Sequence, residues 1–256
     1  MDLDGRVVLV TGGAHRVGQA IAIALAEAGA DVAIAYHRSS DAAAETVGLL
    51  QALGVRAHAV AADLSEPLES ARLVSEVVEA LGPIDVLVNS ASSFARDEFP
   101  THNTAVWYDT FDVVLHAPFH LANAVAPSML ERETGAIVNI VDLSAWQPWP
   151  RRAAHSVAKA GLLALTRQLA VELAPVVRCN AVALGPTIPP TRFSSDQIER
   201  LRNRTLLSRW GGGAEAGRAV RYLAEAEAVT GECLTVDGGE QHEHVRHRFD
   251  DPVGPY

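Results

Sequence analysis

Short β-branched and apolar runs alternate with Ala- and Leu-rich helical patterns through the first 240 residues of the chain. This alternation is typical of βαβ units, in which parallel strands are joined by right-handed helical crossovers. Most runs are apolar at nearly every position, as parallel strands covered on both faces are. The pattern therefore predicts a single-domain, doubly wound α/β sheet over residues 1–240, followed by a polar C-terminal tail at 241–256. The seven expected strands lie at 7–10, 32–36, 57–61, 84–88, 136–141, 177–183 and 233–236.

Composition narrows the classes of function. The 256 residues are 48% hydrophobic, enough for the core of one domain. A formal net charge of −10 and an isoelectric point near 5.4 argue against nucleic-acid and anionic-membrane partners, which need a basic surface. No basic, apolar export signal and no run of about 18 uncharged apolar residues is present. Cys179 and Cys233 lie in strand-like runs that favour buried thiols, so we expect a cytoplasmic protein acting on a small molecule.

Two segments interrupt the alternation. Residues 185–210 are rich in Pro, Ser and Arg and follow the sixth predicted strand, which suits a substrate-covering loop with a short helix. The tail contains His242, His244 and His247, but their spacing matches no common metal-ligand motif. No metal site is predicted there, and a solvated or subunit-contacting tail is the favoured interpretation.

A glycine-rich turn, TGGAHRVG, stands between the first predicted strand and the first predicted helix. Gly12, Gly13 and Gly18 allow a tight turn and let backbone amides approach a pyrophosphate, whose charge the helix N-terminus stabilises. An ordinary tight turn is the alternative. A strand before and an amphipathic helix after, within about thirty residues, favour a dinucleotide site in a Rossmann-type sheet.

The end of the second predicted strand indicates which dinucleotide is bound. A carboxylate at this point would take the ribose hydroxyls of NAD, whereas cations accept the 2′-phosphate of NADP. The sequence offers no carboxylate but has Arg38, with His37 and Ser39 beside it and Arg16 in the glycine-rich turn. NADPH is therefore the expected cofactor, although Arg38 as a solvated surface residue is the alternative.

Several motifs in order resemble the short-chain dehydrogenase/reductase family over residues 5 to about 240. They are TGGAHRVG, Asp63–Leu64, NSAS at 89–92, Lys159, Gly185–Pro186 and TGECLTVDGG near the end. Within that family the chain looks most like the pteridine reductases and their bacterial relatives. The shared features are the Arg of the nucleotide loop, YHRS at the second strand end, NSASSF, and an Asp where other members carry a catalytic Ser.

The resemblance implies roles for individual positions. Phe94 would stack on a pterin ring opposite the nicotinamide, with a core position as the alternative. Trp149 is a candidate by its position after the fifth predicted strand, where it would wall the substrate pocket or merely pack its loop. The candidate substrate residues are Ser92, Phe94, Asp142 and Trp149. The implied cofactor residues are Gly12, Arg16, Val17, Gly18, His37, Arg38, Ser39, Asp63, Leu64, Asn89, Ser90, Ala91, Lys159, Gly185 and Pro186. The family also implies a homotetramer built on its long helices.

The catalytic segment departs from the family pattern. In the family a Tyr protonates the atom that gains charge as hydride arrives, and a Lys four residues later lowers the phenol pKa and holds the ribose. Here Lys159 and Asp142 align, but the Tyr position is His155 and the usual Asn position falls on Val114. The cofactor machinery is thus intact while the proton machinery is changed.

The replacement of Tyr by His155 leaves three hypotheses open. An imidazolium is a competent acid near neutral pH, but Lys159 and burial oppose its charge while Asp142 supports it. An NADPH-dependent reductase of pterin-like or other planar carbonyl or imine substrates, using Asp142, His155 and Lys159, is the favoured interpretation. The alternatives are a nucleotide-binding protein that has lost hydride transfer and an enzyme of a non-redox step, such as dehydration or cyclisation.

Overall fold

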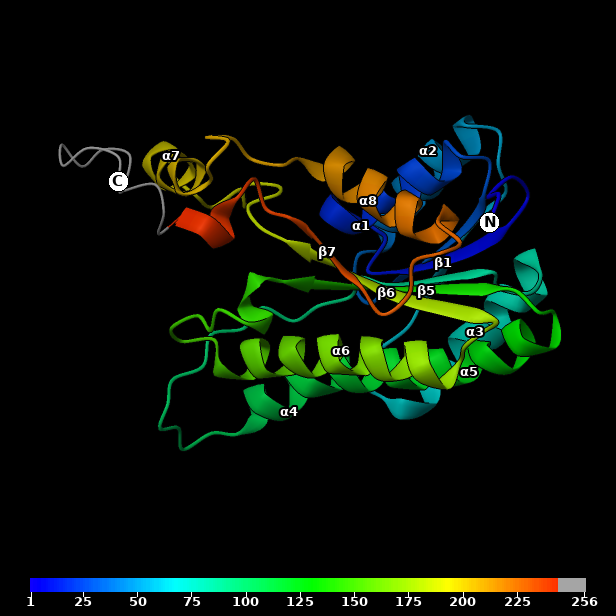
Figure 1. Ribbon diagram of the computed structural model, residues 1–256, viewed down its shortest axis with the longest axis horizontal. Coiled ribbons are helices and arrows are strands. Elements are labelled where there is room, and N and C mark those ends of the chain that lie inside the picture. Colours follow the sequence, from blue (N-terminus) through cyan, green and yellow to red (C-terminus); the bar gives the residue numbers. More distant parts are fainter. Residues whose placement is uncertain (244–256) are drawn as a thin grey trace.

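One sheet of seven parallel strands forms the centre of the protein (Figure 1). The structure, a computed structural model, describes residues 1–243. The strands are β1 (Val7–Thr11), β2 (Asp31–Tyr36), β3 (Ala57–Ala61), β4 (Val86–Asn89), β5 (Gly135–Asp142), β6 (Val177–Leu184) and β7 (Cys233–Val236). All seven predicted strands are confirmed, with ends that differ by at most two residues. Their order in the sheet is β3-β2-β1-β4-β5-β6-β7.

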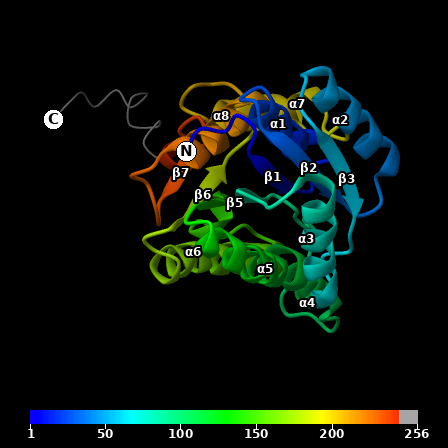
Figure 2. The ribbon, with the colours of Figure 1, turned by 90° about the vertical axis from the view of Figure 1, so that its right-hand side faces the viewer.

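Helices cover both faces of the sheet, as the apolar strands predicted (Figures 1 and 2). One layer holds α1 (Arg16–Ala26), α2 (Ser40–Ala52) and α8 (Gly213–Glu225). The other holds α3 (Pro67–Leu81), α4 (Ala105–Phe111), α5 (Ala117–Glu131) and α6 (Ala153–Glu172). Short helical turns are η1 (Asp112–His116), η2 (Leu143–Ala145) and η3 (Glu240–His242). The predicted helix of the segment after β6 is α7 (Ser195–Arg204), which begins with a Ser194–Gln197 capping box.

The core contains three apolar clusters, of which the two largest lie on opposite faces of the sheet. In β1, Val8 and Val10 join the cluster of α1 and α8, whereas Val7 and Leu9 join that of α3 and α5. Successive side chains of a strand point to opposite faces, so a strand that is apolar at every position is buried on both. This two-sided burial holds the strand ends in fixed positions.

The strand order places a candidate site at the carboxyl ends of the strands. The chain runs outward from β1 to β3 on one side, then crosses back so that β4 pairs with the other side of β1. In such sheets the loops after the strands part at this reversal and leave a crevice beyond the carboxyl ends. The loops that follow β1, β4 and β5 carry the residues singled out by the sequence.

The helical stretch Ala105–Glu131 is, by length and composition alone, apolar enough to cross a membrane. In the fold, however, α5 packs on the sheet within the cluster that it shares with α3. This is the packing of a core helix, and the absence of a membrane partner stays a prediction.

The predicted tail is described only at its start. His242 lies in η3, whereas His244 and His247 lie outside the described residues. Within residues 1–243, no group of three or more His, Cys, Asp or Glu side chains is arranged to hold a metal ion.

Candidate active site

A cavity of about 760 Å³ lies at the carboxyl edge of the sheet, bounded by the loops after β1, β2, β3 and β4. It brings together residues from Gly12 to Val113, which are far apart in the sequence. The predicted cofactor residues that line it are Gly12, Arg16, Val17, Gly18, His37, Arg38, Ser39, Asp63, Leu64, Ser90 and Ala91. Ser92, predicted to contact substrate, lines the same cavity. The cavity is therefore the candidate dinucleotide site.

The glycines of the first loop make room that side chains would fill. Gly12 has a φ of +65°, and a Cβ there would lie 3.0 Å from Ala91 Cα. A Cβ on Gly18 would overlap the carbonyl oxygen of Gly12. The loop thus lies directly against the first turn of α1, where the unpaired amides of a helix N-terminus favour an anion. These residues fit the pyrophosphate of a dinucleotide.

Gly18→Ala is expected to lower both stability and cofactor affinity. The added methyl would meet backbone rather than a movable side chain, so the loop must shift away from α1. We expect a loss of about 2 kcal/mol in the free energy of unfolding and a rise of about a hundredfold in the NADPH dissociation constant. Urea denaturation and fluorescence titration measure the two effects.

Gly48→Ala is the matched control, because Gly48 lies in α2 and an added methyl group there would have no other atom within 4 Å. It should raise stability by about 0.5–1 kcal/mol and leave NADPH affinity unchanged. Equal NADPH affinity in Gly18→Ala and wild type would contradict the assignment of the glycine-rich loop.

The end of β2 presents a cation to the cavity. Arg38 is exposed and, among residues 1–243, forms no ion pair. His37 Nε2 lies 3.3 Å from Asp63 Oδ2. Hydrogen bonds from Ser65 lower the pKa of Asp63 against the opposing effect of burial, and the charges of His37 and Arg38 lower it further. Arg38 therefore remains available to a phosphate.

Arg16 lines the cavity as predicted and also makes contacts that the sequence did not predict. Its backbone has a φ of +56°, and its guanidinium donates to the carbonyl oxygens of Ile188 and Pro189 at 2.8 and 3.3 Å. Arg16 lines the cavity but is also bound to the segment after β6, so it joins the nucleotide loop to the predicted substrate loop.

Four predicted cofactor residues support the cavity from outside its lining: Asn89, Lys159, Gly185 and Pro186. Asn89 is buried and donates to Asn139 Oδ1 at 2.8 Å. A Cβ at Gly185 would lie 2.7 Å from Asp237 Cα, so Gly185 lets β6 and β7 end side by side. Their direct contact with cofactor stays a prediction.

Asp142 and His155 form a buried pair between the end of β5 and the start of α6. His155 Nε2 lies 2.7 Å from Asp142 Oδ2, and its other ring nitrogen, Nδ1, lies 3.0 Å from the carbonyl oxygen of Ser93. The imidazole is only 2% exposed. Asp142 also accepts hydrogen bonds from the amide and the hydroxyl of Ser144.

The hydrogen-bond partners of His155 indicate its protonation state. A carbonyl oxygen and an ionised carboxylate can only accept, so both contacts are satisfied together when both ring nitrogens carry protons. Burial raises the pKa of Asp142, but the hydrogen bond from His155, the charges of Lys159 and His155 and the hydrogen bond from Ser144 outweigh it and lower that pKa overall. The geometry therefore favours an imidazolium–carboxylate pair. Neither ring nitrogen is left free, so proton delivery requires exchange of one of these two bonds.

Lys159 lies one helical turn beyond His155 and is completely buried. Its Nζ donates to the carbonyl oxygen of Ile140 at 2.6 Å. Burial lowers the pKa of Lys159, and the charge of Asp142 opposes this. Three groups that carry charge, Asp142, His155 and Lys159, thus share one buried region, as predicted.

The lowered pKa of Lys159 predicts that alkaline pH stabilises the cofactor-free protein. Between the lowered value and the ordinary value of 10.5, the unfolded chain binds more protons than the folded one, so this contribution to stability rises with pH. Urea denaturation from about pH 7 to pH 10, compared between wild type and Lys159→Met, isolates it. The stability of wild type should rise with pH relative to that of the variant; parallel curves would contradict the buried charge.

Aromatic rings surround His155. The Phe94 ring meets the imidazole edge-on with centroids 4.8 Å apart, and the Trp149 ring lies parallel to it at 6.1 Å. Phe94 is 50% exposed, so its interpretation as a core residue is wrong. Arg152 lies 4.2 Å above the Phe94 ring. Phe94 and Trp149 therefore offer flat apolar walls beside the Asp142–His155 pair, and their contact with substrate stays a prediction.

Val114 occupies the position where the family commonly has Asn. It is fully buried in the π-helical turn η1 and supplies no polar group. The neighbouring Val113 lines the cavity instead. The proton path of this protein therefore lacks the side-chain amide that the resemblance implied.

Three contacts of the site were not predicted from the sequence. The backbone amide of Ser144 donates a hydrogen bond to the carboxylate of Asp142, two residues earlier in the chain. The order Asp-Leu-Ser could have indicated this local turn. Thr11 Oγ1 accepts hydrogen bonds from the backbone amides of Ser90 and Ala91, and these bonds connect the end of β1 to the loop after β4. The Ser93 carbonyl has no sequence signal, because every residue has a backbone oxygen.

The fold, the glycine cradle and the buried charged residues define a nicotinamide-dinucleotide-binding α/β protein. The sequence model described as enoyl-(acyl carrier protein) reductase matches residues 12–241. An uncharacterized oxidoreductase of Mycobacterium tuberculosis is 36% identical over 93% of this chain and 92% of its own length. The 3-oxoacyl-[acyl-carrier-protein] reductase FabG of Staphylococcus epidermidis is 33% identical over 90% of this chain and 97% of its own.

A solved structure extends the comparison. FolM alternative dihydrofolate reductase 1 from Brucella suis, in complex with NADP, is 37% identical, with a TM-score of 0.88, over 94% of this chain and 97% of that one. The chain belongs to the short-chain dehydrogenase/reductase family. Its cofactor is NADP, which related structures of the family hold.

Proposed function

We propose that the protein reduces a pterin-like or other planar carbonyl or imine substrate with NADPH, using Asp142, His155 and Lys159. The observation that carries this proposal is the Asp142–His155 pair, whose imidazole also contacts the carbonyl oxygen of Ser93, a residue that lines the cofactor cavity. Two aromatic walls next to it suit a flat ligand. The similarity to a protein named alternative dihydrofolate reductase adds support for a pterin.

In the proposed reaction, His155, Asp142 and Lys159 have different roles. Bound NADPH supplies the hydride. His155 holds the proton that neutralises the reduced substrate, and Asp142 keeps the imidazole charged and oriented. Lys159 would hold the nicotinamide ribose with the Nζ protons that Ile140 leaves free. The aromatic walls limit access of water to this proton.

A second candidate is a cofactor-binding protein without hydride transfer. It is favoured by one observation, that both nitrogens of His155 are bound by the protein, to Asp142 and Ser93. Val114 adds to it because it removes the usual polar group of the proton path. The two candidates differ in turnover and agree in cofactor binding.

NADPH oxidation with dihydrobiopterin, dihydrofolate and simple planar carbonyls separates the two candidates. The first predicts substrate-dependent oxidation that falls about a hundredfold or more in His155→Ala. His116→Ala is the matched control, since His116 forms an exposed pair with Asp112 at 2.8 Å, and it should keep the wild-type rate. Tight NADPH binding without turnover, unaltered by His155→Ala, would establish the second candidate and overturn the first.

His155→Tyr identifies which departure from the family matters. A large gain in rate would show that only the acid was altered. An unchanged rate would indicate that Val114 and the shape of the pocket, rather than His155, limit the rate of reduction.

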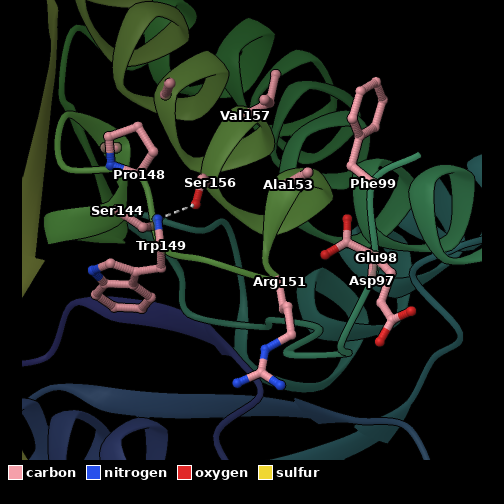
Figure 3. Close-up of a pocket in the computed structure, with 12 residues that line it drawn as sticks. Asp97, Glu98, Phe99, Ser144, Pro148, Trp149, Arg151, Ala153, Ser156 and Val157 are labelled. Carbon is pink, nitrogen blue, oxygen red and sulfur yellow. Dashed lines mark hydrogen bonds between the residues drawn. The ribbon is translucent and has the colours of Figure 1, made fainter. Parts of the chain in front are cut away.

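We also propose a homotetramer built through the outer faces of α4 and α6. Trp107, Tyr108 and Val157 are apolar side chains on these helices that stay 38–62% exposed in the single chain. Val157 and the 88%-exposed Phe99 border a second cavity of about 660 Å³ (Figure 3). Light scattering after size-exclusion chromatography tests this, and a monomer at micromolar concentration would contradict it.

A further inference from the structure

Arg152 lies on an aromatic wall of the site, and the charges of three further arginines act on it. The four residues, here called the arginine cluster, are Arg96, Arg151, Arg152 and Arg192. They come from three loops that are far apart in the sequence. Arg96 follows β4, Arg151 and Arg152 precede α6, and Arg192 belongs to the segment after β6. None of them lines the cofactor cavity.

Arg152 fixes the cluster close to the catalytic pair. Its guanidinium lies 4.2 Å above the centre of the Phe94 ring, and Nη1 donates to the carbonyl oxygens of Ala95 and Arg151 at 3.1 and 3.2 Å. Phe94 in turn contacts His155 with centroids 4.8 Å apart. One aromatic ring therefore separates the cluster from the proposed proton donor.

The charges of the cluster are poorly compensated. Burial lowers the pKa of Arg152, and the charges of Arg96, Arg192 and Arg151 lower it further, opposed by Asp97. Asp97 already accepts the amide of Ala154 at 2.6 Å. Among residues 1–243, no arginine of the cluster forms an ion pair within 4.0 Å.

Several arginines elsewhere on the surface have carboxylate partners. Arg72 pairs with two glutamates, and Arg218 and Arg221 each pair with a glutamate of their own helix. In a chain whose net charge is −10, these four cations lie together with Asp97 as the opposing charge, an arrangement that a bound anion would stabilise. Figure 3 shows the side chain of Arg151 extending away from α6 rather than lying along it.

We propose that the arginine cluster is a subsite for an anionic arm, a carboxylate or phosphate, at the end of the substrate remote from its reducible ring. The inference rests on the proposed function, because the ring must lie at Phe94, Trp149 and His155 for its arm to reach the cluster. Guanidinium groups bind carboxylates and phosphates through paired hydrogen bonds, and an arm of this kind satisfies charges that the protein leaves open. The cluster then selects planar substrates with a charged arm over uncharged ones.

Binding of two oxidised pterins tests the subsite without turnover. Folate carries carboxylates remote from its pterin ring, whereas biopterin carries an uncharged side chain. Isothermal titration in the presence of NADP⁺ should give wild-type protein about tenfold or greater preference for folate. Arg96→Ala/Arg192→Ala should bring the ratio of the two dissociation constants close to one. Raising ionic strength from about 0.05 to 0.5 M should weaken folate binding more than biopterin binding.

The control variant is Arg218→Ala/Arg221→Ala, which removes the same charge from α8 on the opposite face of the sheet and should keep the preference of wild type. A ratio in Arg96→Ala/Arg192→Ala equal to that of wild type, or no preference for folate in wild type, would overturn the subsite.

A third ligand separates this inference from the proposed function. Para-aminobenzoyl-glutamate has the anionic arm without the pterin. If wild type binds it about tenfold more tightly than Arg96→Ala/Arg192→Ala does while no pterin is reduced, the subsite stands and the pterin reductase is wrong. If pterins are reduced but the double variant binds folate and para-aminobenzoyl-glutamate as wild type does, the reductase stands and the subsite is wrong.

Discussion

Asp142→Asn should lower kcat/KM for NADPH-dependent reduction by about 10²–10³-fold. The substitution keeps the shape of the side chain but removes the carboxylate charge that lies 2.7 Å from His155 Nε2. It also leaves the buried Lys159 without its compensating charge. A loss of about 3 kcal/mol in the free energy of unfolding should accompany the loss of activity, because an unpaired buried charge remains.

Steady-state kinetics and urea denaturation measure these two losses. Asp112→Asn is the matched control, since Asp112 belongs to the exposed pair with His116, and it should change both quantities little. A rate for Asp142→Asn within about threefold of wild type would show that the carboxylate does not support the proton donor.

The lowered pKa of Asp142 sets the pH range in which it stabilises the fold. Its contribution is fully present above the ordinary value of 3.8 and is lost as the pH falls through the lowered folded value. Wild type should therefore lose part of its stability below about pH 4, and Asp142→Asn should lack that part of the loss.

Arg38→Asp should reverse the cofactor preference. Arg38 is the exposed cation at the end of β2 that lines the cavity. Its replacement by a carboxylate repels the 2′-phosphate of NADPH and offers an acceptor to the ribose hydroxyls of NADH. We expect KM for NADPH to rise about a hundredfold and KM for NADH to fall.

The NADH measurement is the internal control for Arg38→Asp, because a misfolded variant would lose both cofactors together. Equal losses for NADH and NADPH would mean that Arg38 supports the loop rather than the phosphate. Isothermal titration with both cofactors gives the same comparison when turnover is slow.

The fold could be predicted because its determinants are local and repeated. Each strand is a short apolar run between helical patterns, and the run alone indicates burial on both faces. The errors fall at strand ends such as Asp31 and Gly135, where backbone pairing with Val7 and Val177 extends the strand beyond its apolar residues. The pattern of side chains along the sequence does not indicate where backbone pairing between strands ends.

Those parts of the site that depend on side-chain chemistry and on the spacing of residues could be predicted. The glycines of the first loop and the pairing of Asp142 with His155 follow from residue type and position. The second bond of His155, to a backbone oxygen, and the bonds of Arg16 to Ile188 and Pro189 depend on loop conformations. Such conformations are set by tertiary packing, so the sequence predicted the pair but not that both imidazole nitrogens would be occupied.

The burial of Lys159 has a practical consequence for labelling chemistry. Lys159 is the sole lysine of the sequence, so acylating reagents find no other side-chain amine on the protein. The remaining amine, at Met1, lies 3.1 Å from the carboxylate of Glu227. A second acyl group detected by intact mass spectrometry therefore marks molecules in which Lys159 has become accessible to the reagent. The rate at which this second group appears can be compared between the free protein and the protein with different ligands bound.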